Sequence, residues 1–279
     1  MDAAVRSGLF VSGLQHYLLH GHAEARPGVP LDLDHAFSTW TSEAEWGAWP
    51  PAALRRRVHG DNDLDNFRWL GRRITIDLLV ALADHGLLDA AARPTLDFGV
   101  GCGRLARWWG TLGAGALSGT DIDPVTSRWC VEHLGSPRFS VNPHWPPAAF
   151  RANSFGLIIA ISVFTHLPED MEMAWIAELA RIAEPGAVLA LTSHGVDLQS
   201  DPAKVDVDGS GFVYSDAGGA EGLPDFYRTS FHTAERLRAS WGEHLDIIAV
   251  LPRAVNDHQD LVLARKQPAQ MIGALTSFV

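Results

Sequence analysis

The sequence predicts an α/β protein built around a parallel β-sheet, and two stretches carry that prediction. Residues Thr95 to Asp123 have the pattern of a strand, a glycine turn, a helix and a second strand. Residues Phe155 to Ser162 are almost continuously apolar, which is typical of a parallel strand buried on both faces. In an open sheet of this kind, ligands bind at the carboxyl ends of the strands, so the candidate site is expected there.

The turn after the first predicted strand contains Gly99, Gly101 and Gly103. Glycine reaches positive φ without steric cost and leaves the backbone N–H groups uncovered. A helix is expected to start near Arg104 and to continue to Leu112, because apolar residues recur there at helical spacing. A turn that leads into a helix N-terminus in this way is suited to a polar or anionic ligand.

The second predicted strand ends at Asp121, whose carboxylate could accept hydrogen bonds from both hydroxyls of a ribose. This feature indicates an adenosine-containing cofactor without selecting one. A dinucleotide turn of the form G-x-G-x-x-G would have its third glycine five residues after Gly99, where this sequence has Arg104. The NAD or FAD interpretation is therefore less favoured.

Composition limits the possible functions. With 279 residues, 47% of them hydrophobic, the chain can bury a sizeable core. The formal net charge is −11, and no basic run is longer than Arg55 to Arg57, so nucleic acid is an unexpected partner. No apolar run has membrane-spanning length. Cys102 and Cys130 do not indicate a disulfide framework, and a cytoplasmic location is expected.

Further elements follow from apolar periodicity and from capping residues. A helix capped by Asp61 or Asn62 is expected to end by Gly86, with Phe67 packing in the core or approaching the cofactor. The remaining expected elements are a helix from Pro124 to Leu134, a strand Phe139–Val141, a helix Glu169–Ala183 ended by Pro185-Gly186, a strand Ala187–Thr192, a helix from Thr233 to Trp241, and two last strands, Leu245–Leu251 and Leu261–Ala264.

Two segments have no simple pattern. Residues Met1 to Pro51 contain a short helical stretch near Leu9 to Leu19 and the residues Trp40, Trp46 and Trp49, which could pack on the main domain or close over a pocket as a flap. The long segment Gly195 to Thr229 is rich in Gly, Asp and Ser, and a loop of this length is usually functional, so it is expected to cover the acceptor pocket.

Several motifs resemble the class I S-adenosylmethionine-dependent methyltransferases. LDFGVGCGR followed by GTDIDP resembles their first two motifs, and FGLIIAISVFTHLPED with EPGAVLALTSHG resembles their fourth and fifth strands. FYRTSFH and NDHQDLVLARK are similar to the C-terminal segment of a bacterial small-molecule subgroup. The resemblance extends from Asn62 to about Lys266. It implies a Rossmann-like, seven-stranded, mostly parallel sheet with an antiparallel last strand, to which this chain adds an N-terminal helical extension.

The same resemblance implies a domain organisation and a cofactor site. Residues 1–60 would be an extension, residues 61–267 the methyltransferase domain with a substrate-covering insertion at about 195–229, and residues 268–279 a tail. S-adenosylmethionine would be the cofactor and S-adenosylhomocysteine the product. Asp97 would lie near the methionine ammonium, Asp121 at the ribose, and Ile122 and Asn142 at the adenine. The other implied cofactor-binding residues are Gly99, Gly101, Gly103, Ser162 and Phe164.

The predicted reaction is methyl transfer to a small molecule, with oxygen favoured over nitrogen and carbon, by alignment of the acceptor with the methyl group. A hydroxyl acceptor needs a base, for which His166 is the first candidate and His232 and Tyr227 are further candidates. Two alternatives stay open: a protein of the same fold that catalyses a non-methylation reaction, and an NAD(P)-dependent oxidoreductase.

No metal is expected. Asn256, Asp257, His258 and Asp260 are residue types that bind divalent ions, but a hairpin turn rich in Asn and Asp is the simpler interpretation. The expected partner is a small-molecule acceptor, with neither nucleic acid nor a membrane involved. The oligomeric state is open, and a homodimer is one possibility.

Overall fold

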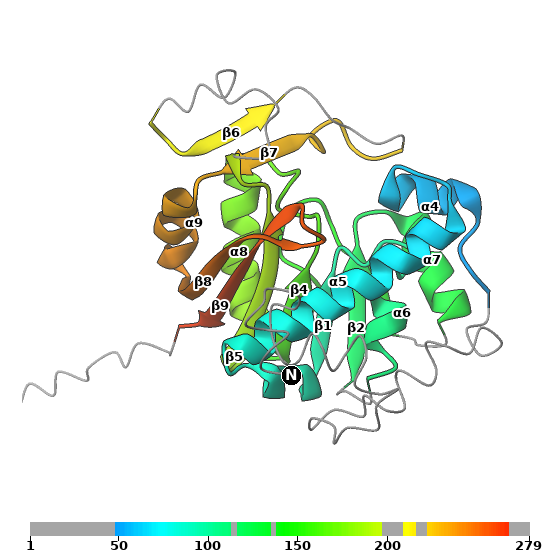
Figure 1. The fold of residues 1–279 in the computed structure, drawn as a ribbon, viewed down its shortest axis with the longest axis horizontal. Coiled ribbons are helices and arrows are strands. Elements are labelled where there is room, and N and C mark those ends of the chain that lie inside the picture. The colour runs from blue at the N-terminus through cyan, green and yellow to red at the C-terminus, as the bar shows by residue number, and fades with distance from the viewer. Residues whose placement is uncertain (1–47, 113–115, 135–137, 197–208, 216–221, 268–279) are drawn as a thin grey trace, which may run out of the picture.

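The computed structural model describes residues 48–112, 116–134, 138–196, 209–215 and 222–267. These residues form a seven-stranded sheet packed between helices, with a two-stranded sheet at one edge (Figure 1). The expected helix near Leu9 to Leu19, Trp40, Trp46 and the tail 268–279 lie outside the described residues.

The large sheet has the strand order β3-β2-β1-β4-β5-β9-β8. Strands β1 to β5 are parallel, and β9 is antiparallel to both of its neighbours, β5 and β8. This confirms the predicted mostly parallel sheet with an antiparallel last strand. The strands are β1 (Thr95–Phe98), β2 (Leu117–Asp121), β3 (Phe139–Val141), β4 (Phe155–Ala160), β5 (Ala183–Ser193), β8 (Leu245–Val255) and β9 (Gln259–Lys266).

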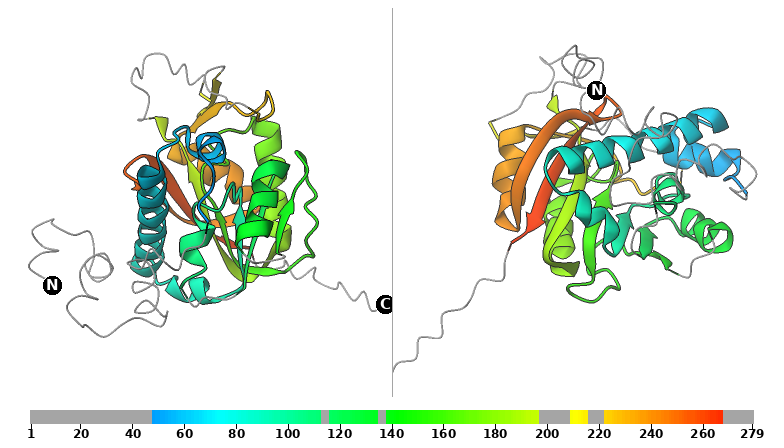
Figure 2. Two further views of the ribbon diagram at one scale, coloured as in Figure 1. Left: turned by 90° about the vertical axis from the view of Figure 1, so that its right-hand side faces the viewer. Right: turned by 60° about the horizontal axis from the view of Figure 1, so that its bottom comes forward.

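Helices cover both faces of the sheet. The apolar side chains of α5 and α6 form one buried cluster with alternate residues of β4, β8 and β9, and those of α8 and α9 form another on the opposite face. Figure 2 shows β8 and β9 between α9 and α5. The helices are α4 (Ala52–His59), α5 (Leu64–Asp84), α6 (Ala106–Trp109), α7 (Pro124–His133), α8 (Glu169–Ile182) and α9 (Ala234–Ser240), with short 3-10 turns at Leu88–Ala92 and Trp241–Glu243.

The N-terminal part of the described chain differs from the prediction. Helix α4 was not expected, and it contributes Leu54 to a third apolar cluster that also contains Phe67 of α5. Phe67 is therefore a core residue. Helix α5 is capped by Asp63, which accepts a hydrogen bond from the Asn66 N–H, rather than by Asp61 or Asn62.

The helix after the glycine turn is shorter than predicted. Helix α6 begins at Ala106 instead of Arg104 and ends at Trp109 instead of Leu112. Hydrogen bonds of 3-10 type replace the helical pattern beyond Trp109, and the Thr111 hydroxyl also donates to the Trp108 carbonyl. The apolar spacing was correct about burial, since Leu105, Trp108 and Leu112 are all in the core, but not about the length of the helix.

Two further boundaries need correction. Helix α8 ends at Ile182, and Pro185 and Gly186 belong to β5, which starts at Ala183 rather than Ala187. The pairing of β4 with β5 changes register between Phe155 and Leu157, and this irregularity accommodates the proline and the glycine. Strands β8 and β9 are also longer than expected and meet in a tight turn at residues 256–258, which confirms the hairpin interpretation of this segment.

The segment Gly195 to Thr229 contains regular structure. Strand β6 (Phe212–Ser215) pairs with β7 (Thr229–His232) to form the small antiparallel sheet. A bridge between Gly195 and His232 and a hydrogen bond from the Ser230 N–H to the Thr165 carbonyl attach β7 beside the ends of β4 and β5. The small sheet therefore lies over the edge where ligands are expected (Figure 1).

Within the described part of the chain, no helix combines the length and the apolar character needed to cross a membrane.

Candidate cofactor and acceptor site

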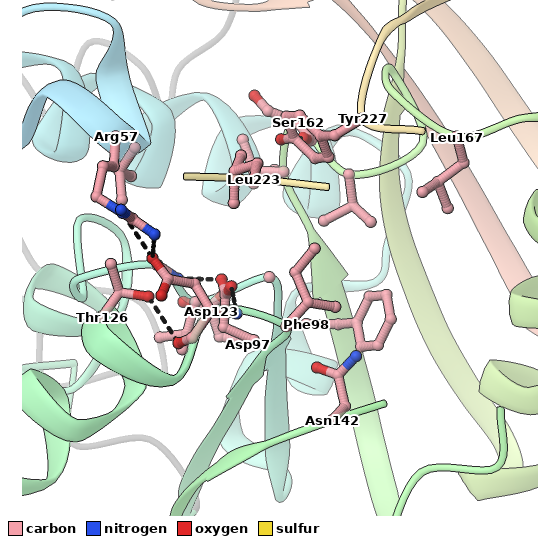
Figure 3. A pocket seen from close by; sticks show the side chains of 18 of the residues that line it. Arg57, Asp97, Phe98, Asp123, Thr126, Asn142, Ser162, Leu167, Leu223 and Tyr227 are labelled. Carbon is pink, nitrogen blue, oxygen red and sulfur yellow. Dashed lines mark hydrogen bonds and ion pairs between the residues drawn. The ribbon is translucent and has the colours of Figure 1, made fainter. Parts of the chain in front are cut away.

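A cavity opens at the carboxyl ends of β1, β2 and β4 and contains most of the predicted cofactor-binding residues (Figure 3). Its floor comes from the strand ends, and its roof comes from α4 and from residues 223–227. The predicted residues that line it are Asp97, Gly99, Gly101, Asp121, Ile122, Asn142, Ser162 and Tyr227. The sequence motifs therefore converge in space although they are up to about 130 residues apart.

Asp121 holds the glycine turn in place. One carboxylate oxygen accepts a hydrogen bond of 2.7 Å from the Gly101 N–H, and the other accepts one of 2.9 Å from the Asp123 N–H. Burial raises the pKa of Asp121, and these two backbone hydrogen bonds act in the opposite direction. The carboxylate is thus oriented at the cavity wall with lone pairs left for a ribose.

Asp97 lies at the end of β1 and is almost fully buried, with 3% of its surface exposed. Its Oδ2 atom has no hydrogen-bond partner among the described residues. Burial, and then the neighbouring Asp121, raise its pKa from 3.8 to about 7. A buried carboxylate oxygen of this kind, at the wall of a cavity, is suited to a cationic or hydrogen-bond-donating ligand group.

The glycines of the turn also serve packing. A side chain at Gly99 would collide with Val163, and one at Gly101 would lie 2.8 Å from Val58. Both glycines have positive φ, at 85° and 54°. Gly103 does not line the cavity, and a side chain there would lie 2.5 Å from Leu134. Gly103 therefore allows close packing of α7, and the structure does not support a direct cofactor contact at this position.

Asn142 follows β3 and lies at the opposite end of the cavity from Tyr227 (Figure 3). Its side-chain oxygen accepts a hydrogen bond from the Thr120 hydroxyl, and its NH₂ group donates to the Pro143 carbonyl. These bonds fix the amide and leave one N–H for a ligand. Asn142 therefore lines the cavity, and its contact with an adenine stays a prediction.

Part of the roof was missed in the sequence. Arg57 of α4 forms an ion pair of 2.8 Å with Asp123 and donates a hydrogen bond of 3.1 Å to the Gly222 carbonyl. It connects α4, the loop after β2 and the segment that precedes Tyr227 around one cavity (Figure 3). The only sequence feature that pointed to Arg57 was the basic run Arg55 to Arg57, and that run was considered only as a possible contact for nucleic acid.

A second cavity adjoins the first, and seven residues line both: Arg57, Val58, Ile74, Arg104, Ile161, Ser162 and Tyr227. Its far side is the β8–β9 turn, which contributes Asn256, His258 and Gln259. Because β9 is antiparallel, this turn lies at the carboxyl edge of the parallel strands. The Asn256 N–H donates to Asp77 of α5 at 2.8 Å, which fixes the turn against that helix.

Ser162 lies at the junction of the two cavities. Its φ of 60° is in the left-handed region, which is strained for a residue with a side chain and is often found at functional sites. The Ser162 N–H donates to the Thr192 hydroxyl, its hydroxyl bonds to the Gln259 amide, and its carbonyl accepts from the Tyr227 hydroxyl at 3.1 Å. The surrounding contacts thus hold this backbone conformation.

His166 lines the second cavity and stacks on Tyr227, with ring centroids 4.2 Å apart. Its Nδ1 lies 2.6 Å from the Arg228 carbonyl, which can only accept, so Nδ1 carries the proton and Nε2 has a free lone pair when the ring is neutral. Burial lowers the pKa of His166. The neutral form, with Nε2 as a proton acceptor, is therefore favoured at neutral pH.

His232 and Phe164 are placed elsewhere. Both ring nitrogens of His232 lie 2.7 Å from a partner, the Ser193 hydroxyl on one side and the Glu172 carboxylate on the other, and the ring is fully buried. Trp241 donates to the same carboxylate. Phe164 is buried against Phe98 and Trp241. Neither residue lines either of the two cavities described, so both have packing roles, and the structure does not support His232 as a base.

One family model and several solved structures are similar to this chain. Residues 96–191 match the model of a family described as a methyltransferase domain. A structure of the PH0226 protein from Pyrococcus horikoshii is similar, with a TM-score of 0.50 and 14% sequence identity. The match covers 68% of this chain and 90% of the P. horikoshii chain. Methyltransferases from Aquifex aeolicus (14% identity, 79% and 100% coverage) and Methanosarcina mazei (20%, 64% and 94%) have TM-scores of 0.49 and 0.48.

At such low identities, the likeness to the P. horikoshii structure supports the fold alone. The family match is more specific, because it covers the segment that contains Asp97, Asp121 and Asn142. Residues 96–191 form a methyltransferase domain of the class I S-adenosylmethionine-dependent type, as the motifs indicated. S-adenosylmethionine is the cofactor of this class, and the unpaired buried oxygen of Asp97 fits its ammonium group.

Proposed function

We propose that the chain transfers a methyl group from S-adenosylmethionine to a hydroxyl oxygen of a small molecule. In this proposal the first cavity holds the cofactor, with Asp97 at the ammonium, Asp121 at the ribose and Asn142 at the adenine. The second cavity holds the acceptor. The observation that supports this division is the wall that the two cavities share, which contains Ser162 and Tyr227.

When bound, S-adenosylmethionine supplies a methyl group on a sulfonium, an electrophile that needs no covalent enzyme intermediate. The protein's contribution is then alignment, which can supply much of the rate acceleration. Tyr227 and Ser162 would define the gap between the acceptor oxygen and the cofactor, since both face the two cavities. The residues of α4 and of 223–227 would exclude water from above.

His166 would take the proton of the acceptor hydroxyl at Nε2. Its other ring nitrogen is committed to the Arg228 carbonyl, and burial keeps the ring neutral, which is the state that a base needs. Tyr227 is less suited to this role, because burial raises its pKa and keeps the phenol protonated. We therefore assign Tyr227 to positioning, through its stacking on His166 and its hydrogen bond to Ser162.

The test combines binding with turnover. S-adenosylmethionine and NADH are titrated separately into the protein, and S-adenosylhomocysteine formation is then followed with a panel of hydroxylated small molecules. His166→Asn is the informative variant, since the asparagine NH₂ can still donate to the Arg228 carbonyl while the proton acceptor is lost. We expect unchanged cofactor affinity and a kcat lower by roughly 100-fold or more.

Three results would contradict the proposal. Binding of NADH alone would mean that the glycine turn was misinterpreted. Bound S-adenosylmethionine that is never converted to S-adenosylhomocysteine would favour a non-methylation reaction on the same fold. Full activity of His166→Asn would remove the base and leave methyl transfer by alignment. The bacterial small-molecule subgroup, a cytoplasmic location and a homodimer stay predictions.

A further inference from the structure

The second cavity differs from the first in its charge. Three aspartates line the first cavity, whereas none of the described residues that line the second is Asp or Glu. The second cavity is instead lined by two arginines, Arg57 and Arg104, and two histidines, His166 and His258.

Two carboxylates near the second cavity, those of Asp77 and Asp123, also bear on its charge. Asp77 accepts the Asn256 N–H from outside the cavity lining and is paired with Arg73 at 2.8 Å. Asp123 is paired with Arg57 and lines only the first cavity. Asp77 is therefore compensated outside the cavity, and the ion pair with Asp123 offsets the charge of Arg57 as well. Arg104, whose charge also acts on Asp97, is the other guanidinium of the lining.

The remaining lining has an apolar side and a polar side. Leu70 and Ile74 of α5, with Val58 and Val255, form an apolar wall, while Asn256, His258 and Gln259 present hydrogen-bonding groups. An acceptor with a hydrocarbon body and a polar end would satisfy both sides. A cationic amine would lose its hydration there without meeting a carboxylate, which is costly.

We propose that the second cavity selects an acidic acceptor, a small hydroxy acid whose carboxylate is bound in the Arg104 and His258 region while its hydroxyl lies near His166. This inference rests on the proposed function, since it assigns the acceptor to the second cavity. Guanidinium groups bind carboxylates through charge-assisted hydrogen bonds, which are stronger than neutral ones. The apolar wall would hold the hydrocarbon part of the acid.

The first test is calorimetric titration of the full chain saturated with S-adenosylhomocysteine. The probes are para-hydroxybenzoate, its neutral analogue para-hydroxybenzamide and its cationic analogue para-hydroxybenzylamine, which differ mainly in charge. We expect the acid to bind at least roughly 10-fold more tightly than the amide and the amine to bind most weakly. Equal affinities, tighter binding of the amine, or no binding of the acid would overturn the inference.

A charge variant tests the location. Asn256→Asp adds a carboxylate to the lining at a residue whose φ of 54° aspartate tolerates, and it should weaken binding of the acid by roughly 10-fold. Asn153→Asp is the matched control: its φ is 56°, it is exposed, and it lines neither cavity, so binding of the acid should not change. Equal effects of the two variants would overturn the assignment to this cavity.

The two proposals fail in different ways. Binding of S-adenosylhomocysteine, measured before the probes are added, reports only on the first cavity. If this product analogue binds and the three probes show no preference for the acid, the acidic acceptor is wrong while the methyltransferase proposal stands. If it does not bind, the proposed function itself is contradicted.

Discussion

Asp97, which we propose binds the ammonium group of the cofactor, should destabilise the ligand-free protein. Its pKa of about 7 in the folded protein, against an ordinary value of 3.8, means that the folded state disfavours the ionised carboxylate. At 1.36 kcal/mol per pH unit, the difference corresponds to about 4 kcal/mol of stability lost when Asp97 is ionised. The group is buried, so solvent screening reduces this figure little.

The sign of the pH dependence follows from the raised pKa. The folded state holds the Asp97 proton more tightly than the unfolded state does, so this group costs nothing well below pH 3.8. The cost grows as the pH rises and is complete above about pH 7. Asp97→Asn removes the charge but can still accept the Ala106 N–H, so we expect the variant to be more stable than the parent by roughly 2–4 kcal/mol at pH 8.

The assay is urea unfolding of the ligand-free protein between pH 5 and pH 8, with Asp246→Asn, an exposed carboxylate, as the control. The gain in stability should increase with pH for Asp97→Asn and be absent for the control. Titration with S-adenosylmethionine should show a loss of affinity of at least roughly 10-fold for Asp97→Asn. A stability difference that does not vary with pH, or unchanged cofactor affinity, would refute this account of Asp97.

Three other perturbations have defined outcomes. Arg57→Met removes the ion pair with Asp123 and should speed dissociation of S-adenosylhomocysteine by roughly 5-fold in stopped flow, and an unchanged rate would show that the roof is held by other contacts. Glu172→Gln disrupts a buried hydrogen-bond network with His232 and Trp241 and should lower the free energy of unfolding by roughly 1–3 kcal/mol without changing cofactor affinity at low temperature. Gly71→Ala would place a methyl group 2.5 Å from the neighbouring helix and cost roughly 1–3 kcal/mol in urea unfolding, whereas Gly242→Ala, with nothing within 4 Å, should be close to neutral.

Local patterns were sufficient for the cofactor half of the site. Asp97 and Asp121 each follow a short β-prone run, and parallel strands bring their carboxyl ends to one edge, so the chain order alone placed these carboxylates together. The continuous apolar run of β4 identified a central strand for the same reason. Strand composition and glycine spacing are local properties, and the sequence contains them directly.

The acceptor half depends on tertiary contacts that no local pattern contains. Arg57 reaches the cavity because α4 lies above the loop after β2, and the run of arginines gives no sign of this. His232 was an equal candidate with Tyr227 because both lie in the same segment, FYRTSFH. Side chains alternate between the two faces of β7, and His232 lies on the buried face with Ser230. The sequence does not show which face is buried, because that depends on what packs against the strand.

The cavity-lining residues come from two sets of segments, one inside and one outside the family match, and this bears on how related proteins can differ in acceptor. The family match, residues 96–191, contains Asp97 and Asp121, which we propose bind the cofactor. Helix α4, residues 223–227 and the β8–β9 turn, which carry Arg57, Tyr227 and His258, lie outside the match. If the proposed assignment holds, exchanging these peripheral segments between relatives would alter the choice of acceptor and leave the methyl donor unchanged. Recombination at these boundaries is therefore a practical route to altered selectivity.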